Sequence, residues 1–486
     1  MVYRGKPGLG CELCRKRRLA CDRRRPSCSQ CLRINQECSG YRDPNTLRIL
    51  DQTNEVAVKA HARRTASKSP PADRSTPPAA LLPPPTSPDE QAMSYVFNYY
   101  VGTLKSQGVM PYLSDLLRGD PSPALQATVR AVGLANMSRE PQYRRLARKE
   151  YGVALRATND ALTHSVSATS DSTLAAVLLL STYEMITCSP WDKLSGWNNH
   201  VQGAIKLLEL RGLEQLDSRA GMELFTTVRF QSAISSIFYR ISSNNTPRMA
   251  ELSIAARSKR NPHFHPIEDF YDILLRLGDL AVRVESAHLG LDFIKNLRHL
   301  IDEAILLDAD MELWRTSLSP FWYYTMVEIP HTPSKNQPHF PHRGDKYHLY
   351  HNVNLASIWN NYRQTRIVVN EMLRFMSLRM WRLQRAPEYQ QTMSQCMETI
   401  QQMVDDICAS IPYHFISGET GFGASIRLLW PLYIAGSSKC TDSSTREWIA
   451  QILDVIGNTV GLQQALSMAQ IVREEASLDV IAGKCS

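Results

Sequence analysis

From about residue 91 to the end of the chain, apolar residues recur every three or four positions, and Pro and Gly mark the breaks between segments. In residues 197–211 the apolar positions form a single stripe, and Gly212 stands where a helix should stop. Residues 174–186 are apolar on nearly every face and follow Ser170-Asp171-Ser172, a typical helix start. The pattern predicts a large all-α domain over residues 91–486, with the 174–186 helix at its centre.

This periodicity is missing between residues 49 and 90. Residues 61–90 contain eight prolines among Ser, Thr and Ala, a composition that favours extended chain and cannot build a core. The apolar residues within 47–59 do not sustain the heptad repeat of a coiled coil. We therefore expect residues 49–90 to be a disordered, Pro-rich linker, and any homodimer contact to come from the helical domain.

The first 48 residues are organised by cysteines instead. Their spacing is C-x2-C-x6-C-x6-C-x2-C-x6-C, formed by Cys11, Cys14, Cys21, Cys28, Cys31 and Cys38. The second triplet repeats the first after seventeen residues, which suggests two metal ions. Two tetrahedral zinc ions need eight coordination positions, so two of the six thiolates must bridge.

Disulfide bonds are the competing interpretation of these cysteines. The chain begins Met1-Val2-Tyr3-Arg4, which does not start a signal peptide, and the other five cysteines are scattered without paired spacing. Both observations favour reduced thiols and therefore metal. No second metal site is predicted.

The positive charge of the chain is concentrated on this cysteine module. The whole chain has a formal net charge of +8, and residues 1–48 account for all of it with twelve Lys/Arg and four Asp/Glu. Four cations lie between the second and third cysteines of the first triplet, but only one lies in the matching part of the second. Six thiolates and two zinc ions would sum to −2 and reduce the module's net charge. The distribution still predicts a nucleic-acid partner that faces the first half, with the second half as a brace.

The cysteine spacing, the basic run after Cys14 and the segment Asp22-Arg23-Arg24-Arg25-Pro26 resemble the fungal zinc binuclear cluster family of transcription regulators. This resemblance implies a nuclear, RNA polymerase II-type regulator with two zinc ions, in which Cys11 and Cys28 bridge and the other four cysteines are terminal ligands. It also implies that the end of the first helix enters the major groove of double-stranded DNA, typically at CGG triplets. Ala20 replaces a basic residue common in the family, so the triplet itself is left open.

The DNA-binding residues that the resemblance and the charge pattern predict fall into two sets. Arg17 and Arg18 occupy the base-reading positions, where arginine can donate two hydrogen bonds to guanine. Phosphate contacts are expected from Arg15, Lys16, Arg23, Arg24 and Arg25. Pro26 is predicted to turn the loop between the two halves.

A second resemblance covers residues 91–480. Segments 180–184, 197–212 and 429–436 resemble the fungal-specific regulatory domain found behind such zinc modules, which implies a helical regulatory and dimerisation domain. It identifies no ligand. Two roles stay open, namely binding of a small-molecule effector and recruitment of the transcription machinery or of co-regulators, including co-repressors.

Three other groups of residues predict no site. The histidines His331, His339, His342, His348 and His351 are expected in a solvated loop, and the acidic residues within 302–312 on the exposed face of a helix. The glycines within 418–423 lack the Lys-Ser/Thr pair of a phosphate-binding loop. The sequence contains no recognisable catalytic arrangement and no apolar run near the roughly twenty residues that span a membrane. We therefore predict neither an enzyme nor a membrane protein.

Overall fold

The computed structural model describes residues 10–41, 87–103, 106–119, 122–137, 140–187, 195–240, 246–286, 293–329, 340–416 and 422–474. The chain divides between Leu82 and Pro83 into two compact units, the cysteine module and the helical domain. Residues 42–86, which hold most of the predicted linker and the 47–59 segment, lie outside the described residues. Within the described residues, no helix combines the length and the apolar character needed to cross a bilayer.

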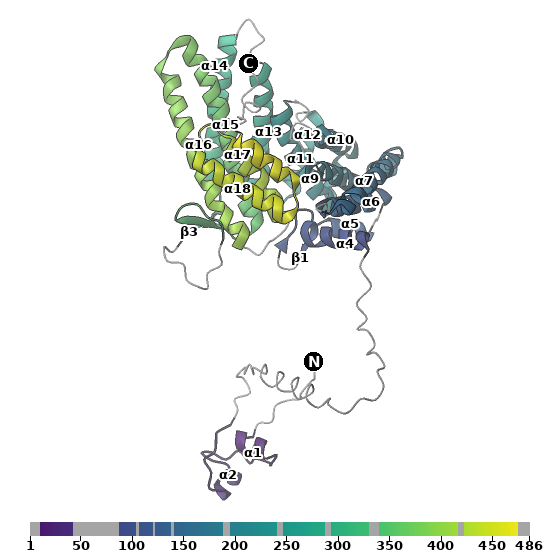
Figure 1. The fold of residues 1–486 in the computed structure, drawn as a ribbon, viewed down its shortest axis with the longest axis vertical. Helices are drawn as coiled ribbons and strands as arrows, with labels where there is room; N and C mark the ends of the chain where they lie inside the picture. Colours follow the sequence, from purple (N-terminus) through teal and green to yellow (C-terminus); the bar gives the residue numbers. More distant parts are fainter. Residues whose placement is uncertain are drawn as a thin grey trace. The chain divides into compact units, whose positions relative to one another are not determined.

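The structure confirms a mainly helical chain. The cysteine module contains the short helices α1 (Glu12–Lys16) and α2 (Ser29–Arg33). The first part of the helical domain (Figure 1) comprises α4 (Pro88–Val96), the π-helix η1 (Phe97–Val101), α5 (Leu113–Gly119), α6 (Pro123–Asn136), α7 (Pro141–Leu162), α8 (Ser165–Ala168), α9 (Asp171–Thr187), α10 (Ser195–Arg211), η3 (Leu213–Asp217), α11 (Arg219–Tyr239) and α12 (Pro247–Lys259). The remainder comprises η4 (Pro262–Phe264), α13 (His265–Ser286), α14 (Phe293–Ser317), η6 (Pro320–Trp322), α15 (Val353–Gln384), α16 (Pro387–Ile416), α17 (Phe422–Ser437), α18 (Ser443–Val460) and α19 (Gln463–Arg473).

Helix α9 lies at the centre of the first part of the domain, as its uniform apolar pattern predicts. Nearly all of its residues are buried, and it packs against α6, α7, α10 and α11. The Ser170 hydroxyl caps its start by accepting a hydrogen bond from the Thr173 amide at 3.1 Å. Helix α10 ends at the predicted stop, because Gly212 has φ +71°, a conformation that glycine adopts without steric cost.

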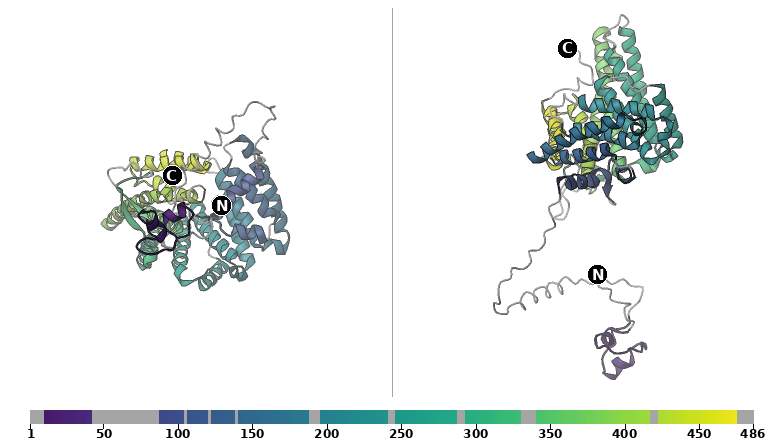
Figure 2. Two further views of the ribbon diagram at one scale, coloured as in Figure 1. Left: turned by 90° about the horizontal axis from the view of Figure 1, so that it is seen from below. Right: turned by 90° about the vertical axis from the view of Figure 1, so that its right-hand side faces the viewer.

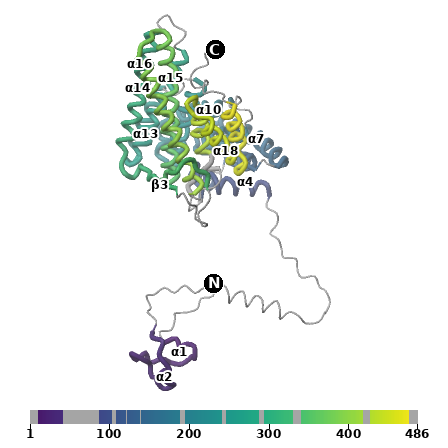
Figure 3. Tube along the Cα trace, turned by 60° about the vertical axis from the view of Figure 1, so that its left-hand side comes forward, coloured from purple at the N-terminus to yellow at the C-terminus, as the bar shows by residue number. Residues whose placement is uncertain are grey.

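The longest helices, α15 and α16, form a hairpin beside α14 (Figures 1 and 3). Arg385 ends α15 in the left-handed conformation, and Pro387 begins α16 at a position where no backbone donor is needed. Helices α17, α18 and α19 pack together at the carboxyl-terminal end of the described chain, coloured yellow-green to yellow in Figure 2.

Helix α4 begins at Pro88, three residues before the boundary expected at residue 91. The Ser87 hydroxyl accepts from the Glu90 amide at 3.2 Å, and the Glu90 carboxylate accepts from the Ser87 amide at 2.8 Å. This reciprocal capping box, with proline at the first helical position, starts a helix. Counting prolines alone placed Ser87 to Glu90 in the linker.

Two short hairpins lie between the helices of this mainly helical domain. Strand β1 (Gly102–Thr103) pairs with β2 (Ser106–Gln107), and β3 (Thr325–Glu328) pairs with β4 (Lys346–Leu349), both antiparallel. The register of the second hairpin places Met326 opposite His348.

The prediction of a solvated histidine loop is wrong for His348. This side chain lies on β4 with 1% exposure, and its Nδ1 lies 3.1 Å from the Arg363 guanidinium and 3.2 Å from the Tyr350 hydroxyl. His342 and His351 are exposed, whereas His331 and His339 lie outside the described residues. Strand β4, which carries His348, has only four residues, too few to give a clear alternation in sequence.

The acidic residues of α14 are also not simply a solvated face. Arg366 of α15 donates to both carboxylate oxygens of Asp308, at 3.0 and 2.8 Å, and also pairs with Glu312. Glu303 pairs with Arg283 and Asp310 with Arg276, both on α13. These carboxylates therefore link α14 to its two neighbouring helices. Of the glycine-rich segment, residues 417–421 lie outside the described residues.

Candidate metal centre and nucleic-acid interface

The two halves of the cysteine module share one backbone design. Cys11 and Cys28 each precede a five-residue helix in the extended conformation, and each helix carries its second cysteine, Cys14 or Cys31, as its only buried residue. The Cys11 sulfur accepts a hydrogen bond from the Cys14 amide at 3.4 Å. A cysteine at the helix start and another one turn later point their sulfurs to the same side, as a C-x2-C metal motif requires.

The repeat continues through the turn that ends each helix. The Leu19 amide donates to the Cys14 carbonyl at 2.9 Å, and the Gln36 amide, seventeen residues later, donates to the Cys31 carbonyl at 3.1 Å. These are the backbone bonds of a Schellman turn, which needs a left-handed residue just before the donor. Arg18, at φ 56°, and Asn35, at φ 51°, fill that position in the first and second halves.

The six sulfurs gather into two overlapping groups. In each group the four sulfur atoms lie within 4.8 Å of one another; one contains Cys11, Cys14, Cys21 and Cys28, and the other contains Cys11, Cys28, Cys31 and Cys38. Cys11 and Cys28 belong to both. The fold therefore supplies two four-sulfur sets from six cysteines.

The spacing of these sulfurs suits zinc and not disulfide bonds. The sulfur of Cys11 lies 3.8 Å from that of Cys28 and 3.7 Å from that of Cys31, and the sulfurs of Cys14 and Cys28 are 3.6 Å apart. Four sulfurs at about 2.3 Å from a tetrahedral zinc ion lie about 3.8 Å from each other, whereas a disulfide bond is about 2.05 Å long. All six thiols are free of disulfides. The donor set therefore fits two zinc ions.

Local electrostatics differ between the cysteines in the same way in both halves. Backbone hydrogen bonds lower the pKa of Cys38 to about 7, and the backbone of Cys28 makes the largest contribution. The backbone of Cys11 lowers the pKa of Cys21 in the same manner. Burial raises the pKa of Cys14 to about 12, and its sulfur neighbours add to the effect. Zinc would favour the thiolate form of these cysteines, because a coordinated thiol is deprotonated by the charge of the ion.

Three residues outside the cysteines support this geometry, and no sequence pattern predicts their roles. Asp22 accepts hydrogen bonds from the amide, at 3.1 Å, and the hydroxyl of Ser29, which fixes the loop between the halves to the start of α2. The Tyr41 hydroxyl donates to the Arg24 carbonyl and lies 4.0 Å from the Cys38 sulfur. A Cβ atom at Gly10 would lie 2.9 Å from the Cβ of Cys21, so the chain passes too closely there for a larger residue.

All seven predicted DNA-binding residues are exposed. On α1 and the turn that ends it these are Arg15, Lys16, Arg17 and Arg18, and in the loop between the halves they are Arg23, Arg24 and Arg25. Lys16 pairs with Glu12 at 3.1 Å and Arg24 with Asp22 at 3.6 Å, and such exposed pairs contribute little to stability. Pro26 follows in the same loop through a cis peptide bond. The cationic surface thus follows the first helix and the loop.

The corresponding surface of the second half is almost uncharged. The residues that match Arg15, Lys16, Arg17 and Arg18 are Leu32, Arg33, Ile34 and Asn35. Leu32 is 64% exposed, and Arg33 donates to Gln30 of the same helix at 2.6 Å. The backbone is repeated but the charge is not, and the division between a binding half and a bracing half stays a prediction.

Comparison with known proteins gives the class. Residues 9–48 match the fungal Zn(2)-Cys(6) binuclear cluster domain, and residues 110–474 match the fungal-specific transcription factor domain. The chain belongs to the fungal Zn(2)-Cys(6) transcription factors, a family of transcription factors and not of enzymes. Membership implies a zinc-dependent, DNA-binding regulator of transcription, and the six clustered cysteines imply two zinc ions.

Two curated relatives illustrate the match. The chain is 26% identical over 228 residues to the transcription factor dbaG of Emericella nidulans, an alignment that covers 42% of this chain and 51% of dbaG. It is 50% identical over 46 residues to the white-opaque regulator 2 of Candida albicans, which covers 10% of each chain. The chain thus spans about half of the first relative and a tenth of the second. No solved structure matches it.

Proposed function

We propose that this chain acts in the nucleus as a sequence-specific regulator of RNA polymerase II-type transcription, and that it reads CGG-like triplets in double-stranded DNA. The observation that carries the proposal is the pair of four-sulfur groups that share Cys11 and Cys28. The helix that holds Cys14 ends in an exposed turn that bears arginines. In this proposal Cys11 and Cys28 bridge two zinc ions, and each of the other four cysteines ligates one ion.

The proposed DNA contacts follow from the position of each cation. Arg17 ends α1 and Arg18 occupies the left-handed turn, so both project from the end of the helix that would enter the major groove. Each reads guanine. Arg15, Lys16, Arg23, Arg24 and Arg25 are exposed beside them and bind phosphates.

The domains proposed are the zinc module at residues 1–48, a linker at 49–90 and the regulatory domain at 91–486. The division of the chain near residue 82 supports a separate amino-terminal module. The start of α4 at Pro88 supports a helical domain that begins close to residue 91. Dimerisation and recruitment of co-regulators are assigned to the helical domain.

Selection of bound sequences from a random duplex pool, with the full-length zinc-loaded protein, tests this function. We expect enriched sequences that contain CGG-like triplets, and two half-sites in them if the protein dimerises. Enrichment of duplexes without any shared triplet would overturn the proposed specificity.

A second candidate function, binding of a small-molecule effector, is favoured by one observation in the helical domain. Side chains from five helices and from the segment before α5 line a cavity there. The chemistry of this cavity is developed below.

A further inference from the structure

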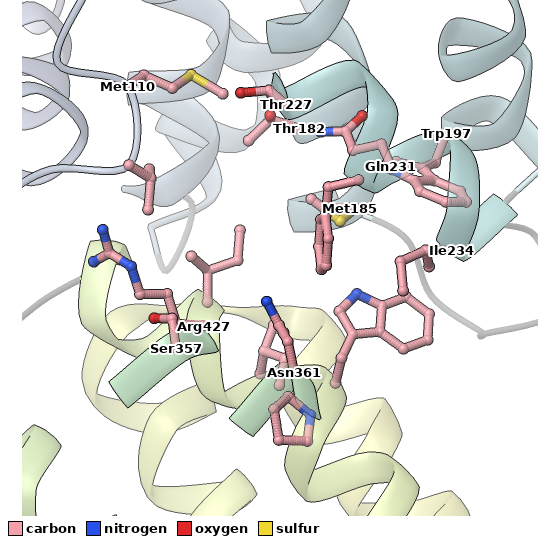
Figure 4. A pocket seen from close by; sticks show the side chains of 16 residues that line it. Met110, Thr182, Met185, Trp197, Thr227, Gln231, Ile234, Ser357, Asn361 and Arg427 are labelled. Carbon is pink, nitrogen blue, oxygen red and sulfur yellow. The ribbon is translucent and has the colours of Figure 1, made fainter. Parts of the chain in front are cut away.

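The cavity lies where the first and last parts of the helical domain meet. Its volume is about 200 Å³. It is lined by α9, α10 and α11 on one side, α15 and α17 on the other, and the segment before α5 (Figure 4). An occupant would therefore contact two groups of helices that are far apart in the sequence.

Most of the wall is apolar and includes several aromatic rings. Trp197, Phe230 and Trp430 contribute these rings, and Met185 and Ile234 add flexible and branched apolar surface. An apolar cavity of about 150 Å³ is large enough for benzene, so this one suits an organic molecule of one or two rings. Such a wall selects a flat, largely apolar occupant over water or a sugar.

Two side-chain amides in the wall each accept one hydrogen bond through their oxygen. The Gln231 carbonyl oxygen accepts from the Ser181 hydroxyl at 3.4 Å, and the Asn361 carbonyl oxygen accepts from Gln364 at 3.1 Å. Among the described residues, none accepts a hydrogen bond from the amide nitrogen of Gln231 or of Asn361.

The indole nitrogen of Trp197 is the most telling of these donors. Trp197 is 2% exposed, and within the described parts of the chain its N–H has no hydrogen-bond acceptor. A buried donor without an acceptor costs about 1–3 kcal/mol, which an occupant with an accepting atom would offset. Figure 4 shows Trp197, Gln231 and Asn361 around the cavity, on three different helices.

The hydroxyl groups in the wall do not supply that acceptor role to Trp197. Thr182, Thr227 and Ser357 each donate to a carbonyl of their own helix at 2.9 Å. Arg427 adds further N–H groups and donates to the Gly108 carbonyl at 3.4 Å and to Asn354 at 3.2 Å. Among the described residues that line the cavity, the buried side-chain donor without an acceptor is the Trp197 N–H.

We propose that this cavity binds a one- or two-ring organic molecule with a carbonyl or carboxylate oxygen, and that this oxygen accepts the hydrogen bond of the Trp197 N–H. The rings occupy the apolar wall, and the amide groups of Gln231 and Asn361 donate to the same or a second oxygen. Binding stabilises the packing of α9–α11 against α15 and α17, because the occupant contacts both only in the folded domain. The effect on transcription rests on the proposed function, whereas binding itself does not.

The test uses full-length, zinc-loaded protein and three probes of similar size, namely 2-naphthoate, 2-acetylnaphthalene and naphthalene. Thermal unfolding and tryptophan fluorescence report binding. We expect saturable binding of at least one oxygen-bearing probe with a rise in Tm, and roughly 10-fold weaker binding of naphthalene, as one hydrogen bond predicts. Equal binding of all three probes, or no binding of any, would overturn the proposal.

Two variants and one control locate the site. Trp197→Phe keeps one aromatic ring and removes the pyrrole ring with its N–H, so it should weaken the oxygen-bearing probes about 5- to 10-fold relative to naphthalene. Ile234→Trp should fill the cavity and abolish binding of every probe while the protein still unfolds cooperatively. Trp448→Phe, on α18 and outside the cavity, should change nothing. Unchanged probe affinity in Trp197→Phe contradicts the assignment of the oxygen.

Duplex binding measured on the same samples separates this proposal from the proposed function. A protein that binds the probes but selects no DNA sequence retains the pocket and loses the DNA-reading role. A protein that selects DNA but binds no probe loses only the pocket.

Discussion

Arg18 and Asn35 occupy the same left-handed backbone position in the two halves of the cysteine module, with φ of 56° and 51°. Asparagine tolerates this conformation well, whereas a long side chain such as arginine adopts it less often. A cation therefore stands where the backbone alone would favour asparagine. Arg385 ends α15 in the same conformation, so the proposed role of Arg18 rests on its position at the end of α1 and not on its φ.

Replacing Arg18 by Asn should remove a base contact without disturbing the turn. We expect Arg18→Asn to retain two zinc ions and to lose about 1–3 kcal/mol of discrimination at a single guanine position. Binding to matched and singly mismatched duplexes measures this loss. Asn35→Ala on the bracing half is the control and should leave the specificity as it is; an equal loss in both variants would mean that the turn matters and the guanidinium does not.

A phosphate-binding cation should behave differently from a base-reading one. Lys16→Ala should weaken binding to all duplexes alike and reduce the slope of log affinity against log salt by about one unit. Titrations at several salt concentrations report the slope. Lys149→Ala, an exposed change on α7, should leave this slope unchanged. If Lys16→Ala instead weakened binding to some sequences more than to others, Lys16 would contact a base and not a phosphate.

The two cysteines shared by both sulfur groups should matter more than the others. Native mass spectrometry of the full-length protein should find no stably bound pair of zinc ions in Cys28→Ser, because both ions lose a ligand. Cys38→Ser should weaken the binding of one zinc ion only. Cys440→Ser, in the helical domain, should retain both zinc ions. Two zinc ions in Cys28→Ser would refute the bridging arrangement.

A buried ion pair links α11 to α13. Arg229 is 1% exposed and pairs with Glu268, which is 2% exposed and lies 2.7 Å from Arg260 as well. Glu268→Ala should lower the free energy of unfolding by about 3–5 kcal/mol, since it leaves Arg229 with the largely exposed Asp272 as its remaining carboxylate partner. The exposed pair of Arg248 and Glu251 is the matched control, and Glu251→Ala should cost less than about 1 kcal/mol in the same urea titration.

The helical domain should lose stability in mild acid through buried neutral histidines. Burial, assisted by the charge of Arg363, lowers the pKa of His348 to about 2, whereas the unfolded side chain titrates near 6.5. Below about pH 6.5 the unfolded chain therefore binds a proton that the folded domain excludes, and stability falls as pH falls.

His348→Gln should reduce this pH dependence, because glutamine can still accept from Arg363 and does not titrate. Urea unfolding at pH 5, 6 and 7 gives the free energy of unfolding at each pH. Its slope against pH should be shallower for the variant than for the native chain. His342→Gln, at an exposed site, should retain the native slope. Identical slopes in all three proteins would exclude His348 as the group responsible.

The sequence predicted those features that depend on spacing within a short segment. Local periodicity and ligand chemistry were enough to predict three features. These are the cluster of six cysteines, the asymmetric charge of the two halves and the central helix α9. The features that were missed depend on partners remote in the chain. His348 lies against Arg363 on α15, and Asp308 of α14 is paired by Arg366 on the same helix.

The same distinction applies to the site and to the pocket. Asp22 and Tyr41 are ordinary residues in sequence, and only the folded loop brings them to Ser29 and Arg24. Trp197 was correctly placed on an apolar stripe, but nothing in a stripe tells whether an indole nitrogen will meet an acceptor. Hydrophobic pattern predicts burial, and it does not predict hydrogen-bond partners.

The interior of the cysteine module consists of four fully buried residues, all of them cysteines, with Leu13 and Tyr41 as its main partly buried non-cysteine neighbours. An aliphatic nucleus of the kind that drives collapse in larger domains is therefore missing from the described part of this module. Under zinc starvation the cell would keep an intact helical domain attached to an amino-terminal segment that no longer folds. Metal supply would then set how many copies of the protein can reach their promoters, independently of how many are synthesised.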